Sequence, residues 1–379
     1  MVQQPISIVG AGIAGLTLGR CLLKRGIQTI IYDKAPSPDR HGYGVTLHPQ
    51  SYSHLLKVLG LDEHDFRKRV AVDAGSGGTG QLDKSSLIHG ADITPSSFRA
   101  HRGRLEQLLA EDLNVQWDCE LAMIDEDEDG LALCFKDGWR VPTKLIVGAD
   151  GSHSNVRQSL LPNEVLEVLP YVVFNGKRSV GDDLFREVYA PALGTSNVIE
   201  HRMKDVVLQV SVNDKSDKYE EQSISWIYFR PARGVSDVLY KPTRSNRAAQ
   251  DIPEELFQEL SSLENLTPIF AEVFCKKNMQ EDRILHWLMR TGLANPKDLQ
   301  NMAQKAVFFI GDSVHAEPII GGYGANSAIE DGLKLAEQIA HGLDGIEAWY
   351  GTRHPVWQQE VEKSWKVIAE THGGQKALL

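Results

Sequence analysis

The feature that most constrains this chain is a glycine-rich turn between two apolar segments near its N-terminus. Residues 6–9 lead directly into GAGIAG, which contains Gly10, Gly12 and Gly15. An apolar pattern with helical spacing follows, and a second apolar segment ends at Asp33. This succession predicts a strand, a tight turn, a helix and a second strand, as found in parallel sheets.

Each glycine has its own physical role in such a unit. Gly10 permits a sharp exit from the strand, Gly12 lets the backbone approach a pyrophosphate, and Gly15 lets the helix pack closely on the sheet. The helix N-terminus presents free N–H groups and a positive dipole end to the phosphates. Asp33 lies eighteen residues after Gly15, where it can accept hydrogen bonds from ribose hydroxyls. The unit predicts a bound dinucleotide without choosing between FAD and NAD.

Length, charge and cysteine content narrow the class of protein. A chain of 379 residues is long for one core, so we expect two domains or one domain with a large insertion. The net charge of −11 leaves no basic face for nucleic acid or an anionic membrane. Four scattered cysteines lack metal-binding spacing, which favours a protein without a metal and a reducing, cytoplasmic location. No segment is typical of a signal peptide or a membrane span.

Two later segments repeat the pattern of an apolar strand that ends in glycine and aspartate. The sequence LIVGAD ends at Asp150 and precedes a helix that contains Arg157. The sequence AVFFIGD ends at Asp312 and is followed by a glycine loop and a helix that begins near Ala325. An unbroken apolar strand of this kind is typical of a buried parallel sheet. Because ligands bind at the carboxyl ends of such strands, all three ends are expected at one site.

The connecting segments supply further candidate site residues. His41, Tyr43 and His48 lie in a proline- and glycine-rich loop beyond the second strand, although any one of them can be an ordinary surface residue. Arg102 and Arg104 lie at the start of a later helix. Because arginine is unfavourable there unless an anion is near, one of the two is expected to contact a phosphate.

Between about residues 169 and 275 the pattern changes to strands rich in aromatic residues. This change predicts a second, mainly antiparallel sheet. Its aromatic residues are candidates to face a substrate, although most are expected in the core. They include Tyr171, Phe174, Trp226, Tyr228 and Phe229.

Four motifs occur in order along nearly the whole chain: GAGIAG, HRGRL, GADGSHSNVR and GDSVHAEPIIGGYGANSAIED. With these motifs the chain resembles the FAD-dependent aromatic hydroxylases, the group A flavoprotein monooxygenases whose type member is p-hydroxybenzoate hydroxylase. The resemblance implies an α/β fold in which a Rossmann-like FAD-binding domain carries an inserted, mainly antiparallel β-sheet substrate domain and a C-terminal helical segment. The expected FAD-binding domain comprises residues 1–70, 98–168 and 276–345, the substrate domain 71–97 and 169–275, and the C-terminal helix 346–379.

The resemblance also implies roles for individual residues. The three glycines would hold the FAD pyrophosphate, Asp33 the adenosine ribose, and Arg102 the phosphates or the ribityl chain. Asp150 and Arg157 match positions that tie loops together and affect NAD(P)H use, and Asp312 matches the residue that binds the ribityl hydroxyls. The full set expected to bind FAD is Gly10, Gly12, Ala14, Gly15, Asp33, Lys34, Arg102, Asp150, Arg157, Asp312, Pro318, Gly322, Gly324, Ala325 and Asn326.

Two positions of the last motif are informative, because one departs from the family pattern and the other matches it. Tyr323 replaces a frequent glutamine in the glycine loop, which would alter flavin mobility or substrate access. His315 matches a common family histidine, and a structural hydrogen bond is the favoured role for it. No catalytic residue is assigned; if the substrate is a phenol that must lose a proton, Tyr43 and His48 are the candidates to accept it.

The implied reaction consumes NADH or NADPH and O₂. Reduced FAD would form a C4a-hydroperoxide that hydroxylates or epoxidises an aromatic or polycyclic small molecule, such as a secondary metabolite. One alternative is an FAD-dependent oxidase or reductase without oxygen insertion, and another is a flavin-binding sensor. A monomer or loose dimer is expected, with a small-molecule substrate and no nucleic-acid partner. The sequence leaves open the substrate and the choice between NADH and NADPH.

Overall fold

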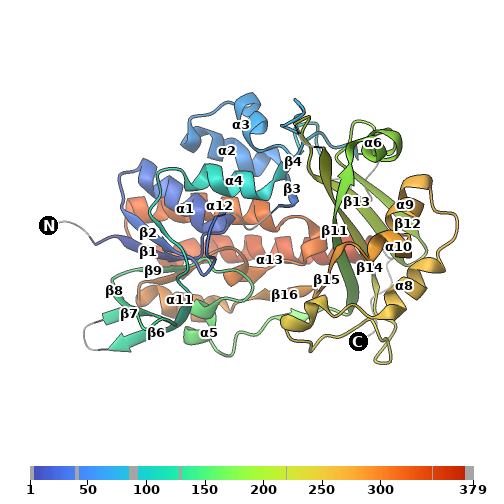
Figure 1. Ribbon diagram of the computed structural model, residues 1–379. Coiled ribbons are helices and arrows are strands. Elements are labelled where there is room, and N and C mark those ends of the chain that lie inside the picture. The colour runs from blue at the N-terminus through green and yellow to red at the C-terminus, as the bar shows by residue number, and fades with distance from the viewer. Residues whose placement is uncertain are drawn as a thin grey trace.

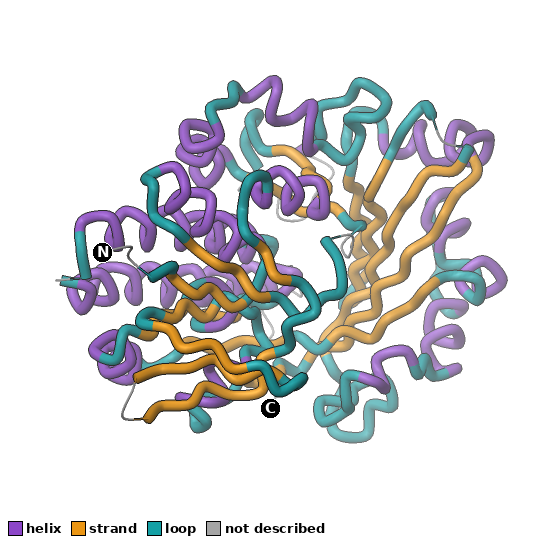
Figure 2. Tube along the Cα trace, turned by 60° about the vertical axis from the view of Figure 1, so that its left-hand side comes forward, coloured by secondary structure: helices purple, strands orange, loops and turns teal. Residues whose placement is uncertain are grey.

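The computed structural model describes residues 4–38, 42–84, 93–127, 130–218, 220–343 and 345–371, so His41 lies outside the described residues. Two sheets with different strand directions dominate the fold (Figure 1). A parallel sheet flanked by helices forms one part, and a larger antiparallel sheet forms the other (Figure 2). Within the described ranges, no helix has both the length and the apolar character needed to cross a membrane.

The parallel sheet is organised around the first strand. Its strand order is β17 (Val307–Phe309), β9 (Ile146–Gly148), β1 (Ile6–Val9), β2 (Thr29–Tyr32) and β5 (Val115–Gln116). The register pairs Val9 with both Tyr32 and Gly148, and Gly148 with Phe309. The carboxyl ends of these four strands are therefore level, and the three glycine- and aspartate-containing strand ends meet as predicted.

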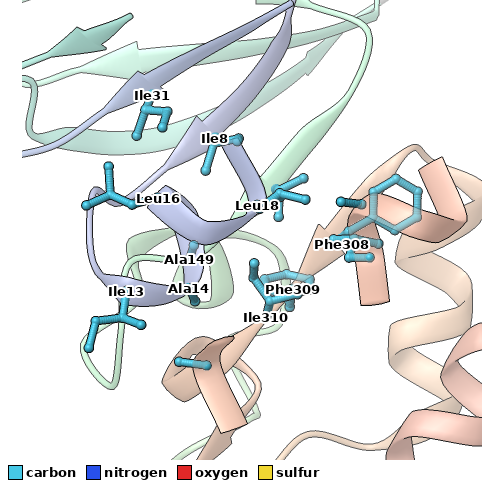
Figure 3. Close-up of a cluster of buried hydrophobic side chains, with 14 of the residues drawn as sticks. Ile8, Ile13, Ala14, Leu16, Leu18, Ile31, Ala149, Phe308, Phe309 and Ile310 are labelled. Carbon is cyan, nitrogen blue, oxygen red and sulfur yellow. The ribbon is translucent and has the colours of Figure 1, made fainter. Parts of the chain in front are cut away.

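Helices enclose the parallel sheet and complete its core. They are α1 (Ile13–Lys24), α2 (Pro49–Leu59), α3 (Glu63–Val70), α4 (Arg102–Ala110), α5 (Asn155–Leu160), α11 (Pro296–Gln304), α12 (Gly324–His341) and α13 (Ile346–Thr371). Figure 3 shows the centre of the core, where Leu16 and Leu18 of α1 lie near Ile8, Ile31 and the strand that carries Phe308. A Cβ on Gly332 of α12 would lie 2.8 Å from the Leu18 nitrogen. Helices α1 and α12 thus approach each other closely at a glycine.

Three smaller sheets connect the parts. They are β3 (Gly44–Leu47) with β4 (Phe98–His101); the meander β6 (Leu121–Asp127), β7 (Gly130–Phe135) and β8 (Arg140–Thr143); and β10 (Glu167–Val168), β16 (Arg290–Leu293) and β18 (His315–Ala316). The β3–β4 pair lies against both sheets, because the Gly44 N–H approaches the Asn213 side-chain oxygen of the antiparallel sheet at 3.4 Å and the Thr46 carbonyl accepts from Asn326 of α12.

The antiparallel sheet has one face covered by short helices. Its order is β12 (Val198–Met203), β13 (Val206–Asp214), β14 (Glu221–Pro231), β11 (Tyr171–Gly181) and β15 (Arg283–Trp287). The covering elements are α6 (Asp182–Leu184), the π-helix at Phe185–Tyr189, α7 (Ala190–Leu193), the 3-10 helix at Arg247–Gln250, α8 (Glu254–Ser261), α9 (Pro268–Val273) and α10 (Lys276–Met279) (Figure 1). Because β15 pairs with β11, we propose that the substrate domain extends past residue 275 to Trp287.

A buried carboxylate joins the end of the parallel sheet to the two C-terminal helices. Asp331 of α12 is fully buried and accepts from the Gly311 N–H at 2.8 Å, from His315 Nε2 at 2.6 Å and from Arg353 Nη2 at 2.7 Å. The Trp357 indole N–H donates to it at 2.8 Å. Burial would raise the pKa of Asp331, but these cationic and hydrogen-bonding partners lower it to about 2. The carboxylate is therefore ionised at neutral pH and links the segment after β17, α12 and α13.

Replacing this carboxylate should destabilise the protein. Asp331→Asn keeps the side-chain shape but removes the nearest negative charge from His315 and Arg353, and breaking comparable buried pairs costs about 3–5 kcal/mol. Denaturant unfolding followed by tryptophan fluorescence would measure the loss. Glu337→Gln is the control, because Glu337 lies on the same helix in an exposed pair with Lys334. Equal stability of the two variants would contradict this role for Asp331.

Candidate active site

Two adjoining cavities lie at the carboxyl ends of β1, β9 and β17. The larger, of about 360 Å³, is lined by the glycine turn, the β3–β4 pair, the segment after β17 and one face of the antiparallel sheet. The smaller, of about 190 Å³, is lined by the ends of β1 and β2 and the segment after β9. Gly12, Arg102, Ala149 and Gly151 line both cavities, so the two form one extended site.

The three glycines of the turn have different surroundings. Gly10 has φ +109°, and a Cβ there would lie 2.3 Å from the Ala149 carbonyl oxygen. A Cβ on Gly15 would lie 2.0 Å from the Gly10 carbonyl oxygen. Gly12, at the N-terminus of α1, meets only Arg102 at 4.0 Å. Gly10 and Gly15 therefore permit close packing of the backbone, whereas the missing Cβ of Gly12 leaves space in the cavity.

Asp33 lines the smaller cavity at the end of β2 together with Lys34. Its carboxylate is buried and accepts from the Ala11 N–H at 2.6 Å and the Ala35 N–H at 2.8 Å. The acid is thus fixed against the glycine turn. Because each carboxylate oxygen can accept a second hydrogen bond, Asp33 can still bind a ligand hydroxyl.

The two arginines at the start of α4 point to different places. Arg102 lines both cavities, donates to Glu106 Oε1 at 2.9 Å and donates to the Tyr43 hydroxyl. Arg104 instead donates to Asp214 Oδ1 at 2.9 Å and to the Val72 carbonyl. Burial would lower the pKa of Arg102, but Tyr43 and Glu106 raise it, so its charge is retained. Of the two arginines, Arg102 is therefore the one whose side chain lines the cavities.

Asp150 and Arg157 hold the segment after β9. Asp150 Oδ2 accepts from the Asn155 N–H at 2.7 Å, whereas its Oδ1 is buried and has no hydrogen-bond partner. Burial raises the pKa of this carboxyl. Arg157 donates to the carbonyls of Ser313 at 2.8 Å and Ser152 at 2.7 Å, and so ties the segment after β9 to the segment after β17. Asp150 lines the smaller cavity, and Arg157 acts behind it.

The segment after β17, from Asp312 onward, forms one wall of the larger cavity. Asp312 lies in the 3-10 turn Gly311–Ser313, and burial raises the pKa of its carboxyl, opposed by His315 and Arg102. The cavity is also lined by Ala14 of α1 and by Pro318, Gly322, Gly324 and Ala325. The last two lie at the N-terminus of α12 and present its positive dipole end to the cavity.

Asn326 has a different position from its neighbours. Its side chain accepts from the His48 N–H at 2.9 Å and donates to the Thr46 carbonyl at 3.0 Å. The residue is buried and is not among those that line the two cavities. We therefore interpret it as a positioning residue that attaches the β3–α2 segment to α12.

Tyr43 and His48 both line the larger cavity. His48 Nδ1 lies 3.0 Å from Ser97 Oγ, and its ring stacks on Tyr323 at 5.8 Å between centroids. The ammonium group of Lys363 in α13 lies 4.5 Å from the Tyr323 ring centroid. Tyr323 is therefore held between two segments at the cavity wall. His315 contacts Asp331 at 2.6 Å, in keeping with the structural role favoured for it.

The face of the antiparallel sheet that borders the cavity is polar. Its lining side chains are Asn175, Glu200, Gln209, Ser211, Asn213 and Ser225, with Val198, Ile227 and Trp287. Of the aromatic residues considered from the sequence as candidates to face a substrate, Phe174, Trp226 and Tyr228 are buried in the core under the short helices. Tyr171 and Phe229 pack in a separate core with Ile368 of α13. All five therefore pack in cores and none lines the cavity, which agrees with the expectation that most of them are core residues.

Sequence reasoning missed several residues of the cavity. Gln209, Ser211 and Asn213 alternate with Leu208, Val210 and Val212 along β13, and this period-two polar pattern was the available signal. Arg99, Glu200 and Glu317 also line the cavity. Glu317 is buried, its Oε1 has no hydrogen bond and lies 3.7 Å from His315 Nδ1, and burial raises its pKa. No local pattern distinguishes these three charged residues from surface charges.

Comparison with known proteins identifies what the chain is similar to. Residues 3–363 match the family model described as "FAD binding domain". The FAD-dependent monooxygenase vrtH of Penicillium aethiopicum is 32% identical over 405 residues, covering 99% of this chain and 97% of that protein. The FAD-dependent monooxygenase nscC of Trichophyton tonsurans is 31% identical, covering 89% and 85% respectively.

Solved structures share the fold. The 2,6-dihydroxypyridine-3-hydroxylase of Arthrobacter nicotinovorans superposes with a TM-score of 0.71 at 19% identity, covering 98% of this chain and 94% of that one. HpxO of Klebsiella pneumoniae, solved with FAD and uric acid, gives a TM-score of 0.68 at 19% identity, covering 97% and 89%. The mixed α/β architecture is thus that of flavin-dependent hydroxylases.

The different surroundings of the glycines predict different costs of substitution. Gly15→Ala should lower the free energy of unfolding by about 1–3 kcal/mol, because its Cβ would overlap the Gly10 carbonyl oxygen. Gly12→Ala should change it by less than about 0.5 kcal/mol, because its Cβ would enter open space. Denaturant titration of both variants measures the difference. Equal destabilisation would refute this division of roles.

Proposed function

The chain belongs to the FAD binding domain family and is an FAD-dependent monooxygenase, and from this premise we propose that it consumes NADH or NADPH to hydroxylate or epoxidise an aromatic or polycyclic small molecule. The observation that carries the proposal is the extended site at the level strand ends, where the smaller cavity beside Asp33 continues into the larger one bordered by the antiparallel sheet. A secondary metabolite is a suitable substrate class.

The residues at the strand ends fit the two halves of FAD. In the smaller cavity, Gly12 leaves open space beside the cation of Arg102, which suits a pyrophosphate, and Asp33 suits the adenosine ribose. The unpartnered Asp150 Oδ1 is a further acceptor there. In the larger cavity, the carboxylate of Asp312 suits the ribityl hydroxyls. Gly324 and Ala325 would place the α12 dipole at the flavin edge where negative charge develops on reduction.

The donor of electrons is anionic, and a group of cations supports its docking near the smaller cavity. His153 lines that cavity with Lys34. Burial lowers the pKa of His153, and the nearby charges of Arg290 and Lys34 lower it further. This concentration of positive charge favours the phosphates of NADH or NADPH without distinguishing between them.

Bound FAD would supply electron transfer from the nicotinamide and the activation of O₂, so the protein's own groups have to bind, orient and exclude water. Arg102 and the α1 N-terminus would neutralise the cofactor's phosphates. Tyr323 and the preceding glycine loop would cover the reacting face. For a phenolic substrate, His48 is the better candidate than Tyr43 to accept the proton, because Ser97 orients its ring and the Tyr43 hydroxyl already accepts from Arg102.

Labelled oxygen provides the decisive experiment. The purified protein is supplied with NADH or NADPH, ¹⁸O₂ and a panel of phenols and polycyclic aromatic compounds, and products are analysed by mass spectrometry. We expect substrate-dependent NAD(P)H oxidation and one ¹⁸O atom in the product. Turnover that yields an unlabelled product and hydrogen peroxide would instead indicate an oxidase or reductase without oxygen insertion.

A second prediction concerns cofactor retention. Asp312→Ala should weaken FAD binding by about 10- to 100-fold, because the ribityl hydroxyls would lose charged acceptors worth about 1.5–3 kcal/mol. Asp312→Asn, which keeps one acceptor, should have an intermediate affinity. Fluorescence titration of the apoprotein with FAD measures both values, and Asp298→Ala, in the first turn of α11 at a residue that lines neither cavity, serves as the control. Unchanged affinity in Asp312→Ala would remove Asp312 from the FAD site.

A further inference from the structure

Arg99 is a charged residue of the larger cavity that the cofactor roles above do not use. It lies on β4 between Phe98 and Ala100, both fully buried in the core. Side chains alternate along a strand, so Arg99 extends to the other side, where it lines the cavity. Its Nη1 donates to Thr46 Oγ1 at 3.1 Å. The position of the guanidinium is therefore set by the β3–β4 pair itself.

This cation is poorly compensated. Among the residues that the structure describes, no carboxylate forms an ion pair with Arg99, and its buried Nε has no hydrogen-bond partner. A Cβ on Gly44 would lie 2.6 Å from that Nε, so the backbone packs directly against the guanidinium. Burial lowers the pKa of Arg99 to about 10, although Glu200 and Tyr43 oppose the shift. A partly buried cation without a paired anion is unfavourable, and a ligand anion would offset the cost.

The neighbouring polar side chains of the sheet are largely engaged with one another. Gln209 donates to Glu200 Oε1 at 2.6 Å, and Asn213 donates to Ser225 Oγ at 2.7 Å while accepting from the Gly44 N–H. Glu200 is thus already supplied with a donor. Arg99 is therefore the charged hydrogen-bond donor of this wall that is left to bind a ligand.

We propose that Arg99 binds an anionic oxygen of the substrate, so that the enzyme selects aromatic compounds carrying a carboxylate or an ionised phenol or enol over their neutral analogues. The inference rests on the proposed function, since it takes the larger cavity as the substrate chamber. A guanidinium forms short, charge-assisted hydrogen bonds to such oxygens and can engage two of them at once. The polar wall beside it, including Gln209 and Ser211, can accept further oxygen substituents on the ring.

Calorimetric titration with a matched pair of ligands tests this selectivity. The FAD-loaded protein is titrated with 1-hydroxy-2-naphthoate and with its methyl ester, which share the ring system but differ in charge. Loading with FAD occupies the phosphate-binding residues, so that Arg102 does not compete for the probe. We expect the wild-type protein to bind the carboxylate about 10- to 100-fold more tightly than the ester, the range expected for a charge-assisted hydrogen bond.

Two arginine substitutions distinguish a specific contact with Arg99 from a general effect of removing one positive charge. Arg99→Gln should bring the two affinities within about threefold of each other, mainly by weakening carboxylate binding. Arg104→Gln, five residues away and paired with Asp214, removes the same charge and should retain the wild-type preference. Arg99→Lys keeps the charge and should retain part of the preference. It therefore remains informative if Arg99→Gln does not fold.

The proposed role of Arg99 can be refuted independently of the proposed oxygenation reaction. Calorimetry does not depend on turnover, and FAD content and ¹⁸O incorporation are measured separately. A wild-type protein with no preference for the carboxylate, or an Arg99→Gln protein that keeps the full preference, would overturn the role of Arg99 even if labelled oxygen enters a product. Conversely, a lost preference in Arg99→Gln together with unlabelled products would support the anion site and refute the monooxygenase reaction.

Discussion

The close approach of two strand ends determines the rest of the site. The Ala149 N–H donates to the Val9 carbonyl at 2.8 Å, and the turn that follows Val9 runs so near to Ala149 that only glycine fits at position 10. The same turn brings the Gly10 carbonyl against Gly15 of α1. Because the parallel register also aligns β2 and β17 with these strands, Asp33, Asp150 and Asp312 all reach one edge of the sheet. One packing constraint therefore gathers residues separated by almost 280 positions.

This constraint explains why the meeting of the three strand ends could be predicted from the sequence. A glycine required by a backbone contact leaves a local signature, and so does an aspartate that follows an apolar strand. The substrate half has no such signature. Whether Trp226 or Ser225 faces the cavity depends on which side of the sheet the short helices cover, and that is decided by residues far along the chain. The same limit applies to Asn326, whose motif position predicts a cofactor contact but whose side chain binds the backbone of the β3–α2 segment.

Buried charge is the second organising element, and it acts in two ways. Around Asp331, opposite charges compensate one another: burial would lower the pKa of His315, but Asp331 raises it, so the histidine remains protonated to higher pH. The stability from His315 is present below its unfolded pKa and is lost as pH rises through the raised value. The contribution of Asp331 is lost only as pH falls toward about 2. Between these limits the ion pair holds α13 against the end of β17. Arg99, by contrast, has no such partner within the described chain, and its charge is directed to the ligand.

The short sequence FRAHRGR distributes three arginines among three tasks through backbone geometry alone. In β4, alternation places Arg99 on the cavity side, opposite the buried Phe98 and Ala100. At His101 the strand changes to helix, and the 3.6-residue period takes over. Arg102, at the first helical position, reaches the cofactor side of the cavity, and Arg104 turns away to Asp214 of β13. The strand-to-helix junction thus directs Arg99 and Arg102 to the cavities and Arg104 to the antiparallel sheet. Shifting the junction by a single residue would redirect Arg102 and Arg104, whereas the pairing of Arg99 with Thr46 of β3 would keep Arg99 in place.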